Sequence, residues 1–519
     1  HPGPDVPLPR PFFAAGAAPV LTAAQLQAWD AAAVQAHGVA EPVLMEAAGR
    51  ATAAVVQALV PEGRVVAAAG SGHNGGDAVI AARALRAWGR EVSLVSVGSR
   101  PPDAALLHGW EVETHSAGAA AEAFRGAAVV LDGLLGTGAT GAPRDAYAAV
   151  IEAMNASGAP VVAVDGPSGV DLTTGAAPGA AVRAEATVTF GALKRGLLLF
   201  PGRKLAGRIV VVEIGFPPLA AAEGRHALLT APWARALLPP VEPDAHKGRM
   251  GKVYLVAGRV GMGGAAVLAG MGALRAGAGM AVLVSPGANR LLHQSALPEA
   301  LFVDRDTLDA GFQADARAVV AGPGMGTDEE ALAVLRTVLT GGEAPLLLDA
   351  DAVTLLGRDP ALRDAFERPL VLTPHPGEMT RLLPGRAVGD VTADPFAAAA
   401  EAAERFRCTV LLKGAPSVVA HPDGRALVNV AGHSGIATGG MGDVLSGVIG
   451  AFLAVGLEPF EAAGCGLWYA GRAAELAERG RGLMPRDVAE ALPLALQEEP
   501  ARESELGLPG VLLDLPPAR

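Results

Sequence analysis

Short apolar runs alternate with longer amphipathic segments along most of the chain. In the first part, RVVAAAG at 64–70, AAVVLD at 127–132 and PVVAVD at 160–165 each lead into a glycine-rich stretch. A second series of such runs begins with KVYLVAG at 252–258. Short buried strands that alternate with helices are typical of parallel sheets covered on both faces. The pattern therefore predicts an α/β fold with a doubly wound parallel sheet in each of two domains.

The alternation is interrupted between residues 218 and 245, where prolines recur without a sustained helical or strand period. We therefore predict that this segment links two domains, one at 19–219 and the other at 240–495. The stretch 186–217 is expected to add edge strands to the first sheet. After about Ala491 the sequence predicts a mostly irregular tail.

The amino-acid composition argues against several classes of protein. The 519 residues are 51% hydrophobic but only 4% aromatic, so the cores must be filled by Ala, Val and Leu. The net charge of −12 argues against a general nucleic-acid binder. Two cysteines, Cys408 and Cys465, cannot make a disulfide framework, and no apolar run reaches the roughly 18 residues of a membrane span. We expect a soluble, cytoplasmic protein with neither nucleic-acid nor membrane partners.

The first candidate site combines a glycine-rich loop with polar residues at strand ends. GSGHNGGD at 70–77 lies between a predicted strand and a helix, where backbone N–H groups favour anions. Asp132 and Asp165 each end a predicted strand, and such ends meet at one edge of a parallel sheet. Asn74, Asp132 and Ser168 could therefore converge and offer hard oxygen atoms to an alkali or alkaline-earth cation. The alternative is that the aspartates only cap the following turns.

The second candidate site lies in ATGGMGDVLSG at 437–447. Its glycines precede Asp443 at the start of a predicted helix, where N–H groups could hold a phosphoryl group. Asp443 could accept the proton of an attacking hydroxyl group, as kinase bases do. The alternative is an aspartate favoured only by the helix dipole. Lys413, at a turn between strands, is a candidate phosphate contact, and His375, between two prolines, is a candidate ligand contact.

The motifs of the first part resemble the NAD(P)H-hydrate epimerase family. GSGHNGGDAVIAARAL, LDGLLGTGATG, VDGPSGVDLTTG and ATVTFGALKRGL follow that family's order and spacing within residues 20–217. The resemblance implies a Rossmann-like domain that interconverts the R and S forms of hydrated NADH and NADPH. It implies a potassium ion bound by Asn74, Asp132 and Ser168, with Asp165 at the catalytic centre. The implied substrate contacts are His73, Asn74, Gly75, Gly76, Asp77, Gly136, Thr137, Gly138, Ala139, Thr140, Gly141, Ala142 and Asp165.

Two positions in this part depart from the family pattern. His73 stands where the family usually has asparagine, and Ala78 stands where it usually has glycine. A histidine ring still offers a hydrogen-bond donor and an acceptor. We therefore expect substrate binding to survive both changes.

The motifs of the second part closely resemble ADP-dependent NAD(P)H-hydrate dehydratase. GPGMG, LLLDADAV, LTPHPGE, LLKGA and ATGGMGDVLSG occur in order within 245–492. The resemblance implies a ribokinase-like domain that phosphorylates the hydroxyl group of the S form with ADP and Mg²⁺ and then eliminates phosphate. The implied hydrate contacts are Ala265, Gly322, His375 and Asp443, with Ala266 as an alternative to Ala265. The implied nucleotide contacts are Lys413, Gly414, Ala415, Pro416, Ser417 and Gly442. His433 stands where this family often has asparagine.

The sequence thus favours a bifunctional repair enzyme, an isomerase joined to a lyase, which acts on hydrated NADH and NADPH. One rival is a ribokinase-like kinase that phosphorylates a vitamin or a sugar and releases a stable phosphoester; the LTPHPGE motif favours the dehydratase. Another rival is a first part that binds nucleotides or partners without catalysis, although Asp132, Asp165 and Ser168 are all present. We also expect a homo-oligomer.

Overall fold

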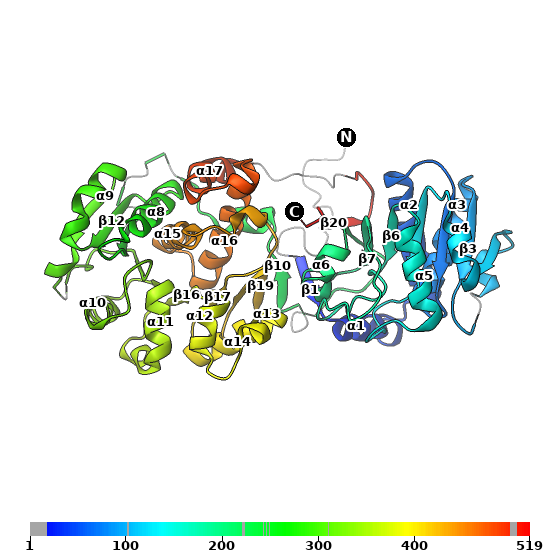
Figure 1. Ribbon diagram of the computed structural model, residues 1–519, viewed down its shortest axis with the longest axis horizontal. Helices are drawn as coiled ribbons and strands as arrows, with labels where there is room; N and C mark the ends of the chain where they lie inside the picture. The colour runs from blue at the N-terminus through cyan, green and yellow to red at the C-terminus, as the bar shows by residue number, and fades with distance from the viewer. Residues whose placement is uncertain are drawn as a thin grey trace. The chain divides into compact units, whose positions relative to one another are not determined.

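The computed structural model describes residues 18–100, 103–220, 224–241, 243–244, 247–248, 250–309, 311–498 and 506–518. They form two compact units (Figure 1). Unit 1 comprises residues 18–225 and 506–518, and unit 2 comprises residues 226–498. The predicted α/β class with a parallel sheet in each part is confirmed.

Unit 1 is built on a parallel sheet with strand order β20-β9-β7-β6-β5-β2-β3-β4, in which β20 alone is antiparallel to its neighbour. The strands of unit 1 are β1 (Ala18–Leu21), β2 (Val65–Ala69), β3 (Val92–Ser96), β4 (Glu113–Ser116), β5 (Val129–Gly133), β6 (Val161–Val164), β7 (Ala186–Phe190), β8 (Leu193–Lys194), β9 (Arg208–Val212) and β20 (Val511–Leu515). Strands β1 and β8 pair with each other and are not part of this sheet. Its helices are α1 (Ala23–Gln35), α2 (Glu41–Leu59), α3 (His73–Ala87), α4 (Ala120–Phe124), α5 (Asp145–Ala156) and α6 (Gly202–Leu205).

Strand β2 shows why this sheet is covered on both faces. Val65, Ala67 and Ala69 belong to a core cluster with residues of α2 and α3, whereas Val66 and Ala68 belong to a cluster with residues of α4 and α5. Successive side chains of a strand point to opposite faces, so a run that is apolar at every position must be buried on both. The continuous apolar runs of the sequence are explained by this double burial.

Three features of the chain differ from expectation. The stretch 186–217 does supply β7 and β9, but they lie inside the sheet, and β20 occupies the edge. The segment after Ala491 is not an irregular tail, because α17 continues to Gln497 and β20 pairs with β9. In the expected linker at 218–245, β10 and α7 are formed; residues 221–223, 242 and 245 of that segment are outside the described part of the chain.

Unit 2 has a sheet of order β13-β12-β11-β14-β15-β16-β17-β18-β19-β10, which is parallel from β13 to β17. Its strands are β10 (His226–Leu228), β11 (Lys252–Val256), β12 (Met280–Ser285), β13 (Leu301–Asp304), β14 (Ala318–Ala321), β15 (Leu346–Leu348), β16 (Leu370–Leu372), β17 (Thr409–Leu412), β18 (Ser417–Ala420) and β19 (Ala426–Asn429). Its helices are α7 (Ala231–Leu237), α8 (Gly263–Arg275), α9 (Arg290–Ala296), α10 (Glu329–Thr340), α11 (Ala350–Arg358), α12 (Pro376–Leu382), α13 (Val388–Ala393), α14 (Pro395–Phe406), α15 (Met441–Ala454), α16 (Pro459–Leu476) and α17 (Pro485–Gln497).

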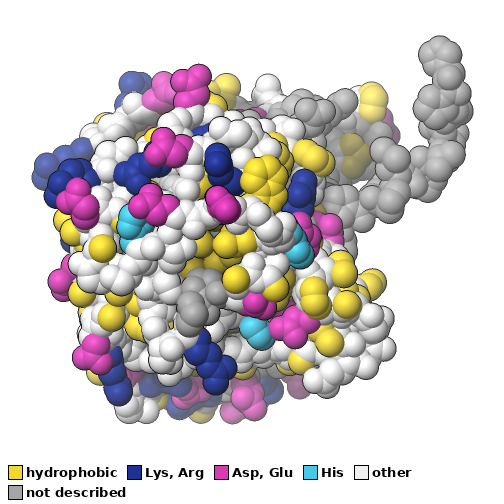
Figure 2. Space-filling view, turned by 90° about the vertical axis from the view of Figure 1, so that its right-hand side faces the viewer, with side chains coloured by type: hydrophobic (Ala, Val, Ile, Leu, Met, Phe, Trp, Pro, Cys, Tyr) yellow, Lys and Arg dark blue, Asp and Glu magenta, His cyan; other side chains and the backbone are white. Residues whose placement is uncertain are grey.

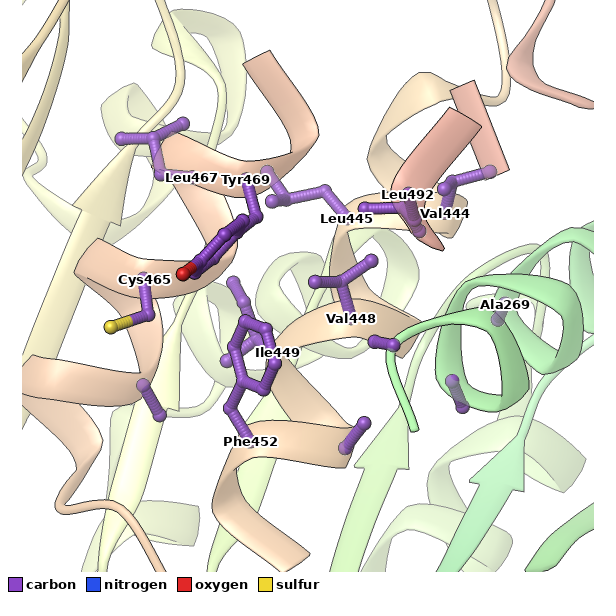
Figure 3. Packing of buried hydrophobic residues seen from close by; sticks show 14 of the residues in the cluster. Ala269, Val444, Leu445, Val448, Ile449, Phe452, Cys465, Leu467, Tyr469 and Leu492 are labelled. Atoms are coloured by element: carbon purple, nitrogen blue, oxygen red, sulfur yellow. The ribbon is translucent and has the colours of Figure 1, made fainter. Parts of the chain in front are cut away.

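Helix α15 is the centre of the unit 2 core. Figure 3 shows Val448 and Phe452 of this helix beside Tyr469 of α16, and the rings of Phe452 and Tyr469 meet edge to face with centroids 5.9 Å apart. Helices α15 and α8 approach closely, since a Cβ atom on Gly447 would lie 1.9 Å from the carbonyl oxygen of Ala269. The glycine thus sets the distance between two helices that both carry predicted site residues.

The surface of the molecule carries charges of both signs. On the face drawn in Figure 2, basic and acidic side chains are interspersed among hydrophobic ones. Helices in the described ranges lack the combination of length and apolar character that crossing a bilayer requires.

Candidate active sites

A cavity of about 500 Å³ opens in unit 1 at the carboxyl ends of β2, β5 and β6. Helices α1 and α2 contribute to its wall, as do aromatic side chains at Phe190 and Phe216. The predicted site residues that line it are His73, Asn74, Asp77, Gly136, Thr137, Gly138, Ala139 and Asp165. Both glycine-rich loops therefore meet at one cavity, as expected for strand ends in a doubly wound sheet.

The other predicted contacts of unit 1 lie beside this cavity without lining it. A Cβ atom on Gly75 would lie 1.9 Å from the carbonyl oxygen of Gly70, so this glycine allows the loop to fold tightly upon itself. One on Gly76 would lie 2.3 Å from the Met45 side chain. Thr140, Gly141 and Ala142 follow the lining part of the second loop.

The two departures from the family pattern fall in different places. The His73 imidazole is exposed, and its Nε2 lies 3.0 Å from Oε1 of Glu41, which also lines the cavity. Ala78 is fully buried, and a Cβ atom on Gly133 would lie 2.3 Å from its methyl group. The first change therefore alters the cavity wall, whereas the second alters packing behind it.

Asn74, Asp132 and Ser168 converge as predicted. The Ser168 hydroxyl donates to Oδ1 of Asp132 at 2.6 Å, and the Ser168 N–H donates to Oδ2 at 2.8 Å. Asn74 donates through Nδ2 to the carbonyl oxygen of Leu135 at 3.1 Å. Burial raises the pKa of Asp132 to about 6, against the opposing effect of its hydrogen bonds from Ser168.

This cluster has the donors that a potassium ion requires. Oδ1 of Asn74 is buried and has no hydrogen-bond partner among the described residues. Beside it are a carboxylate, a hydroxyl group and the carbonyl oxygen of Leu135, to which the Ser168 hydroxyl lies 3.4 Å away. Hard, mostly uncharged oxygen donors suit an alkali cation. The residues present therefore fit the ion that the resemblance implies.

Asp165 is held by a lysine that sequence reasoning did not select. Its backbone φ is +68°, a left-handed conformation that is uncommon for residues other than glycine and often found at functional sites. Lys194 is fully buried and forms an ion pair with Asp165 and a 2.6 Å hydrogen bond to Thr189. Asp30 on α1 lines the same cavity and was also missed. The one signal for Lys194 was the rarity of lysine, of which the chain has five.

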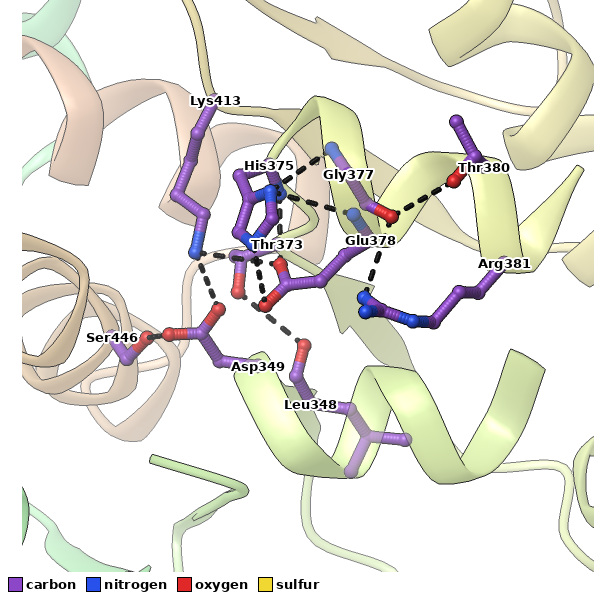
Figure 4. A network of polar contacts seen from close by, with 10 residues as sticks. All are labelled: Leu348, Asp349, Thr373, His375, Gly377, Glu378, Thr380, Arg381, Lys413 and Ser446. Atoms are coloured by element: carbon purple, nitrogen blue, oxygen red, sulfur yellow. Dashed lines mark hydrogen bonds and ion pairs between the residues drawn. The ribbon is translucent and has the colours of Figure 1, made fainter. Parts of the chain in front are cut away.

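The polar site of unit 2 centres on Asp349, directly after β15 (Figure 4). One oxygen of its carboxylate accepts from Lys413 at 2.6 Å, and the other accepts from Ser446 at 2.8 Å. Glu378 lies 4.0 Å from the Lys413 ammonium and accepts from the backbone N–H of His375 at 2.8 Å. Burial lowers the pKa of Lys413, but Asp349 and Glu378 outweigh it, and the pKa is raised. This lysine therefore stays charged inside the site.

Asp443 lies in the first turn of α15, beside the same network. Burial raises the pKa of Asp443 to about 7, with a further contribution from Asp349. A Cβ atom on Gly442 would lie 3.3 Å from the Lys413 ammonium, so the helix start and the lysine are neighbours. A carboxyl group with this pKa is suited to take up a proton near neutral pH.

The remaining predicted residues of unit 2 surround this network. Gly322 follows β14 with φ +127°, and a Cβ atom there would lie 1.8 Å from the carbonyl oxygen of Asp349. Ala265 is on the first turn of α8, next to Gly324. Gly414, Ala415, Pro416 and Ser417 form the turn between β17 and β18. His375 caps α12, with its side chain accepting from the N–H of Gly377 at 3.0 Å.

The His433 side chain stabilises a loop of unit 2 through two contacts. Its Nδ1 accepts from the N–H of Gly435 at 3.0 Å, and its Nε2 lies 3.2 Å from the carbonyl oxygen of Ala474 on α16. The ring therefore fixes the loop that leads to Asp443. An asparagine at this position could make the first of these contacts.

Comparison with known proteins decides the family. Residues 253–494 match the family model described as NAD(P)H-hydrate dehydratase, and residues 41–196 match the model described as YjeF-related protein N-terminus. The chain is 36% identical to the bifunctional NAD(P)H-hydrate repair enzyme Nnr of Moorella thermoacetica, over 92% of this chain and 96% of that protein. It is 38% identical to the Escherichia coli enzyme of the same name, over 88% and 90% of the two chains. The chain belongs to the bifunctional NAD(P)H-hydrate repair enzyme family.

Among the solved structures similar to part of this family member is one from Bacillus subtilis. It is the crystal structure of ADP/ATP-dependent NAD(P)H-hydrate dehydratase from Bacillus subtilis, co-crystallized with ATP/Mg²⁺. The two are 32% identical, with 52% of this chain and 96% of that chain covered and a TM-score of 0.48.

Sequence reasoning on this family member missed the centre of the unit 2 network. Asp349 and Glu378 lie in the motifs LLLDADAV and LTPHPGE, but neither residue was predicted as a site residue, and nor was Ser446. Their position at strand ends was the available signal. Asp349 follows β15 as Asp165 follows β6, and the same argument from parallel strands applies to both.

Proposed function

We propose that unit 1 interconverts the R and S forms of hydrated NADH and NADPH, and that unit 2 converts the S form to NADH or NADPH with ADP. The observation that carries this proposal is the presence of one polar site in each unit, at the carboxyl ends of its own parallel strands. Membership of a bifunctional family agrees with two sites. A stereospecific dehydratase leaves the other epimer unrepaired, so an epimerase in the same chain completes the repair.

The chemistry of unit 1 requires a proton carrier next to the substrate. Inverting a carbon that bears a hydroxyl group requires a bond at that carbon to break and form again. Asp165 lines the cavity and is fixed by its ion pair with Lys194, so it is placed to exchange a proton with the substrate. Asn74, Asp132 and Ser168 would hold the potassium ion, which supplies a positive charge near the anionic part of the substrate.

The chemistry of unit 2 converts a poor leaving group into a good one. Asp443 takes the proton of the substrate hydroxyl, whose oxygen attacks the terminal phosphorus of ADP and releases AMP. Elimination of inorganic phosphate then restores the ring double bond. The N–H groups at the start of α15 and the ammonium of Lys413 stabilise the phosphoryl group during transfer.

Magnesium in this reaction is expected to arrive on the phosphates of ADP. Within the described ranges no group of three or more His, Cys, Asp or Glu side chains is placed to hold a metal ion. Mg²⁺ commonly binds through substrate phosphates and one or two carboxylates and keeps several waters.

The proposal is tested with purified S and R hydrates of NADH. The protein with ADP and Mg²⁺ should regenerate NADH absorbance from both epimers, and from the R form only by way of the S form. AMP and inorganic phosphate should form in equal amounts. Accumulation of a stable phosphorylated product would instead support the kinase alternative.

The proposal also includes the cellular compartment and the oligomeric state of the enzyme. Cys408 and Cys465 are free and buried, as suits a reducing compartment such as the cytoplasm. We expect the protein to act there as a homo-oligomer. Light scattering coupled to size-exclusion chromatography measures the oligomeric mass directly.

A further inference from the structure

Four carboxyl groups line the unit 1 cavity, and three of them are aspartates from different elements. Asp30 comes from α1, Asp77 from α3, and Asp165 from the end of β6. Asp77 and Asp165 are each 8% exposed. Three carboxylates in one partly enclosed space cannot all be ionised at low cost, because like charges repel in a medium of low dielectric constant.

Among the described residues, Asp165 is the one of these three aspartates that forms an ion pair with a cation. The Lys194 ammonium forms its ion pair with Asp165 and donates hydrogen bonds to the Thr189 hydroxyl at 2.6 Å and the Phe190 carbonyl oxygen at 3.4 Å. Because Lys194 is fully buried, water does not screen this pair. An adjacent positive charge favours the ionised form of a carboxyl group. The pairing therefore places the negative charge on Asp165.

Asp77 is in the opposite situation. Within the described chain it has neither an ion pair nor a side-chain hydrogen bond, although it lies in the same cavity. Burial raises the pKa of Asp77 well above its ordinary value, and the charges of Asp165 and Asp30 add to this effect. The remaining charged groups near the cavity, His73 and Glu41, lie 3.0 Å apart and are exposed.

We propose that Lys194 fixes the negative charge on Asp165 and leaves the proton on Asp77, so that these two carboxyl groups are the base and the acid of epimerisation. This inference rests on the epimerase function proposed for unit 1. Opposite protonation states in neighbouring carboxyl groups are how active sites divide such roles. Lys194 does not line the cavity and is a positioning residue.

With Asp77 as the acid and Asp165 as the base, every atom and electron pair in the epimerisation is accounted for. Water adds to an enamine at the carbon next to nitrogen, so the hydroxyl group of the hydrate is beside the ring nitrogen. Asp77 gives its proton to the hydroxyl oxygen, the C–O bond breaks with its electron pair on oxygen, and water leaves while the nitrogen lone pair forms a C=N bond. Water then forms a C–O bond on the other face, the C=N π electrons return to nitrogen, and Asp165 takes the surplus proton. A water molecule that enters the cavity can carry that proton from Asp165 back to Asp77 and so restore the starting state.

The pH profile of epimerisation tests the role of Lys194. In the wild type, kcat/KM for epimerisation should fall at both low and high pH, because the reaction needs one carboxyl group ionised and the other protonated. Lys194→Met should move the low-pH limb of this profile upward by about 1–3 pH units, because the positive charge paired with the base is gone. Lys194→Arg should keep the limb near its wild-type position. An unmoved limb in a folded Lys194→Met variant would overturn the proposal.

Lys204→Met is the matched control for Lys194→Met. Lys204 is exposed on α6 of the same unit, so this variant should keep both the wild-type rate and the wild-type profile. The Tm of unit 1 in each variant checks that this unit is folded, and dehydration of pure S hydrate checks that unit 2 is unchanged. If the wild type itself fails to epimerise, the proposed function of unit 1 is wrong. If the wild type epimerises but the pH profile of Lys194→Met is not shifted, only the proposed role of Lys194 is wrong.

Asp77→Asn provides a test that does not depend on the folding of the lysine variants. Asparagine matches the size and neutrality of the protonated acid but cannot give up a proton in this way. The epimerisation kcat should fall by at least about 10²-fold, with KM within a few-fold of wild type and the alkaline limb lost. Asp103→Asn, at an exposed helix cap in the same unit, is its control. A kcat within a few-fold of wild type with the alkaline limb retained would exclude Asp77 as the acid.

Discussion

Asp443 is the residue whose change should separate the two activities most clearly. Asparagine has nearly the same shape but cannot accept the proton of the substrate hydroxyl. Asp443→Asn should therefore lower the rate of dehydration by at least about 10²-fold. ADP binding and epimerisation should stay close to wild type, because Asp443 belongs to unit 2. Both rates and ADP affinity are measured on one preparation; dehydration within a few-fold of wild type would leave Asp443 with only a structural role.

The pKa of Asp443 also predicts the pH dependence of dehydration. Burial raises this pKa to about 7, and a general base must be ionised to act. The kcat/KM for dehydration should therefore rise as the pH passes through about 7 and level off above it. The profile of NADH recovery from pure S hydrate measures this directly. A rate that is already maximal at pH 5 would contradict the assignment.

Asp132 carries the only formal charge among the three proposed potassium ligands. Asp132→Ala should reduce epimerisation sharply, while dehydration of S hydrate continues. A second readout is thermal unfolding, because a ligand that binds only the folded protein raises Tm with its concentration. Potassium should raise the Tm of wild-type unit 1 more than sodium does, and this difference should vanish in the variant. Equal effects of both salts on the wild type would argue against a selective site.

The sequence was informative about single residues at strand ends and uninformative about their partners. Asp132 and Asp165 were selected because apolar runs stop at them. The structure brings Asp132 to Ser168, and it brings both Ser168 and Asn74 to the carbonyl oxygen of Leu135. Lys194 pairs with a residue 29 positions away, and Lys413 pairs with Asp349 over 64 positions. Such pairs depend on strand order and register, which no local pattern reveals.

Among the elements, helices α8 and α15 pack so closely that they leave no room for a larger side chain at Gly447. Gly447→Ala places a methyl group against the Ala269 carbonyl, so the helices must separate. Overpacking of this kind typically costs about 1–3 kcal/mol. We expect a lower Tm for unit 2 and slower dehydration, measured by thermal unfolding and NADH recovery. Gly389→Ala on α13 is the control, since a Cβ atom there meets nothing within 4 Å.

The strands and helices that belong to the regular alternation of apolar runs and amphipathic segments were predictable from the sequence. The elements outside this alternation were not. The strands from β2 to β6 were visible because apolar runs, glycine loops and helices repeat in order. Strand β20 is a single short run, VLLDL, after a polar stretch, and its partner β9 is far away in the sequence. Without that partner in view, an irregular tail was the simpler interpretation. The same lack of context made β9 look like an edge.

At the scale of the whole molecule, residues 506–518 belong to unit 1, whereas residues 226–498, which precede them in the sequence, form unit 2. Asp514 forms a two-pronged ion pair with Arg208, at 2.8 and 2.7 Å, and Arg203 donates to the carbonyl oxygen of Pro516. Deleting 506–518 should therefore lower the Tm of unit 1 and the yield of active epimerase. Dehydration should be unaffected, because unit 2 keeps all its elements.

Two variants sharpen this deletion experiment. Asp514→Ala removes the ion pair but keeps the β20 backbone, so its effect on Tm should be smaller than that of the deletion. A fragment of residues 226–500 tests whether unit 2 folds and dehydrates without unit 1. An unchanged epimerase Tm in the deletion variant would show that β20 is dispensable.

The return of the chain to unit 1 also has a consequence for protein synthesis. A ribosome makes β9 and then the whole of unit 2 before it makes β20. Strand β9 therefore lacks its β20 partner while unit 2 folds. Strand β20 can pair with it only after residue 515 has left the ribosomal exit tunnel. A chain whose translation stops early carries a complete dehydratase beside an epimerase with an uncovered strand, which proteases and chaperones can recognise.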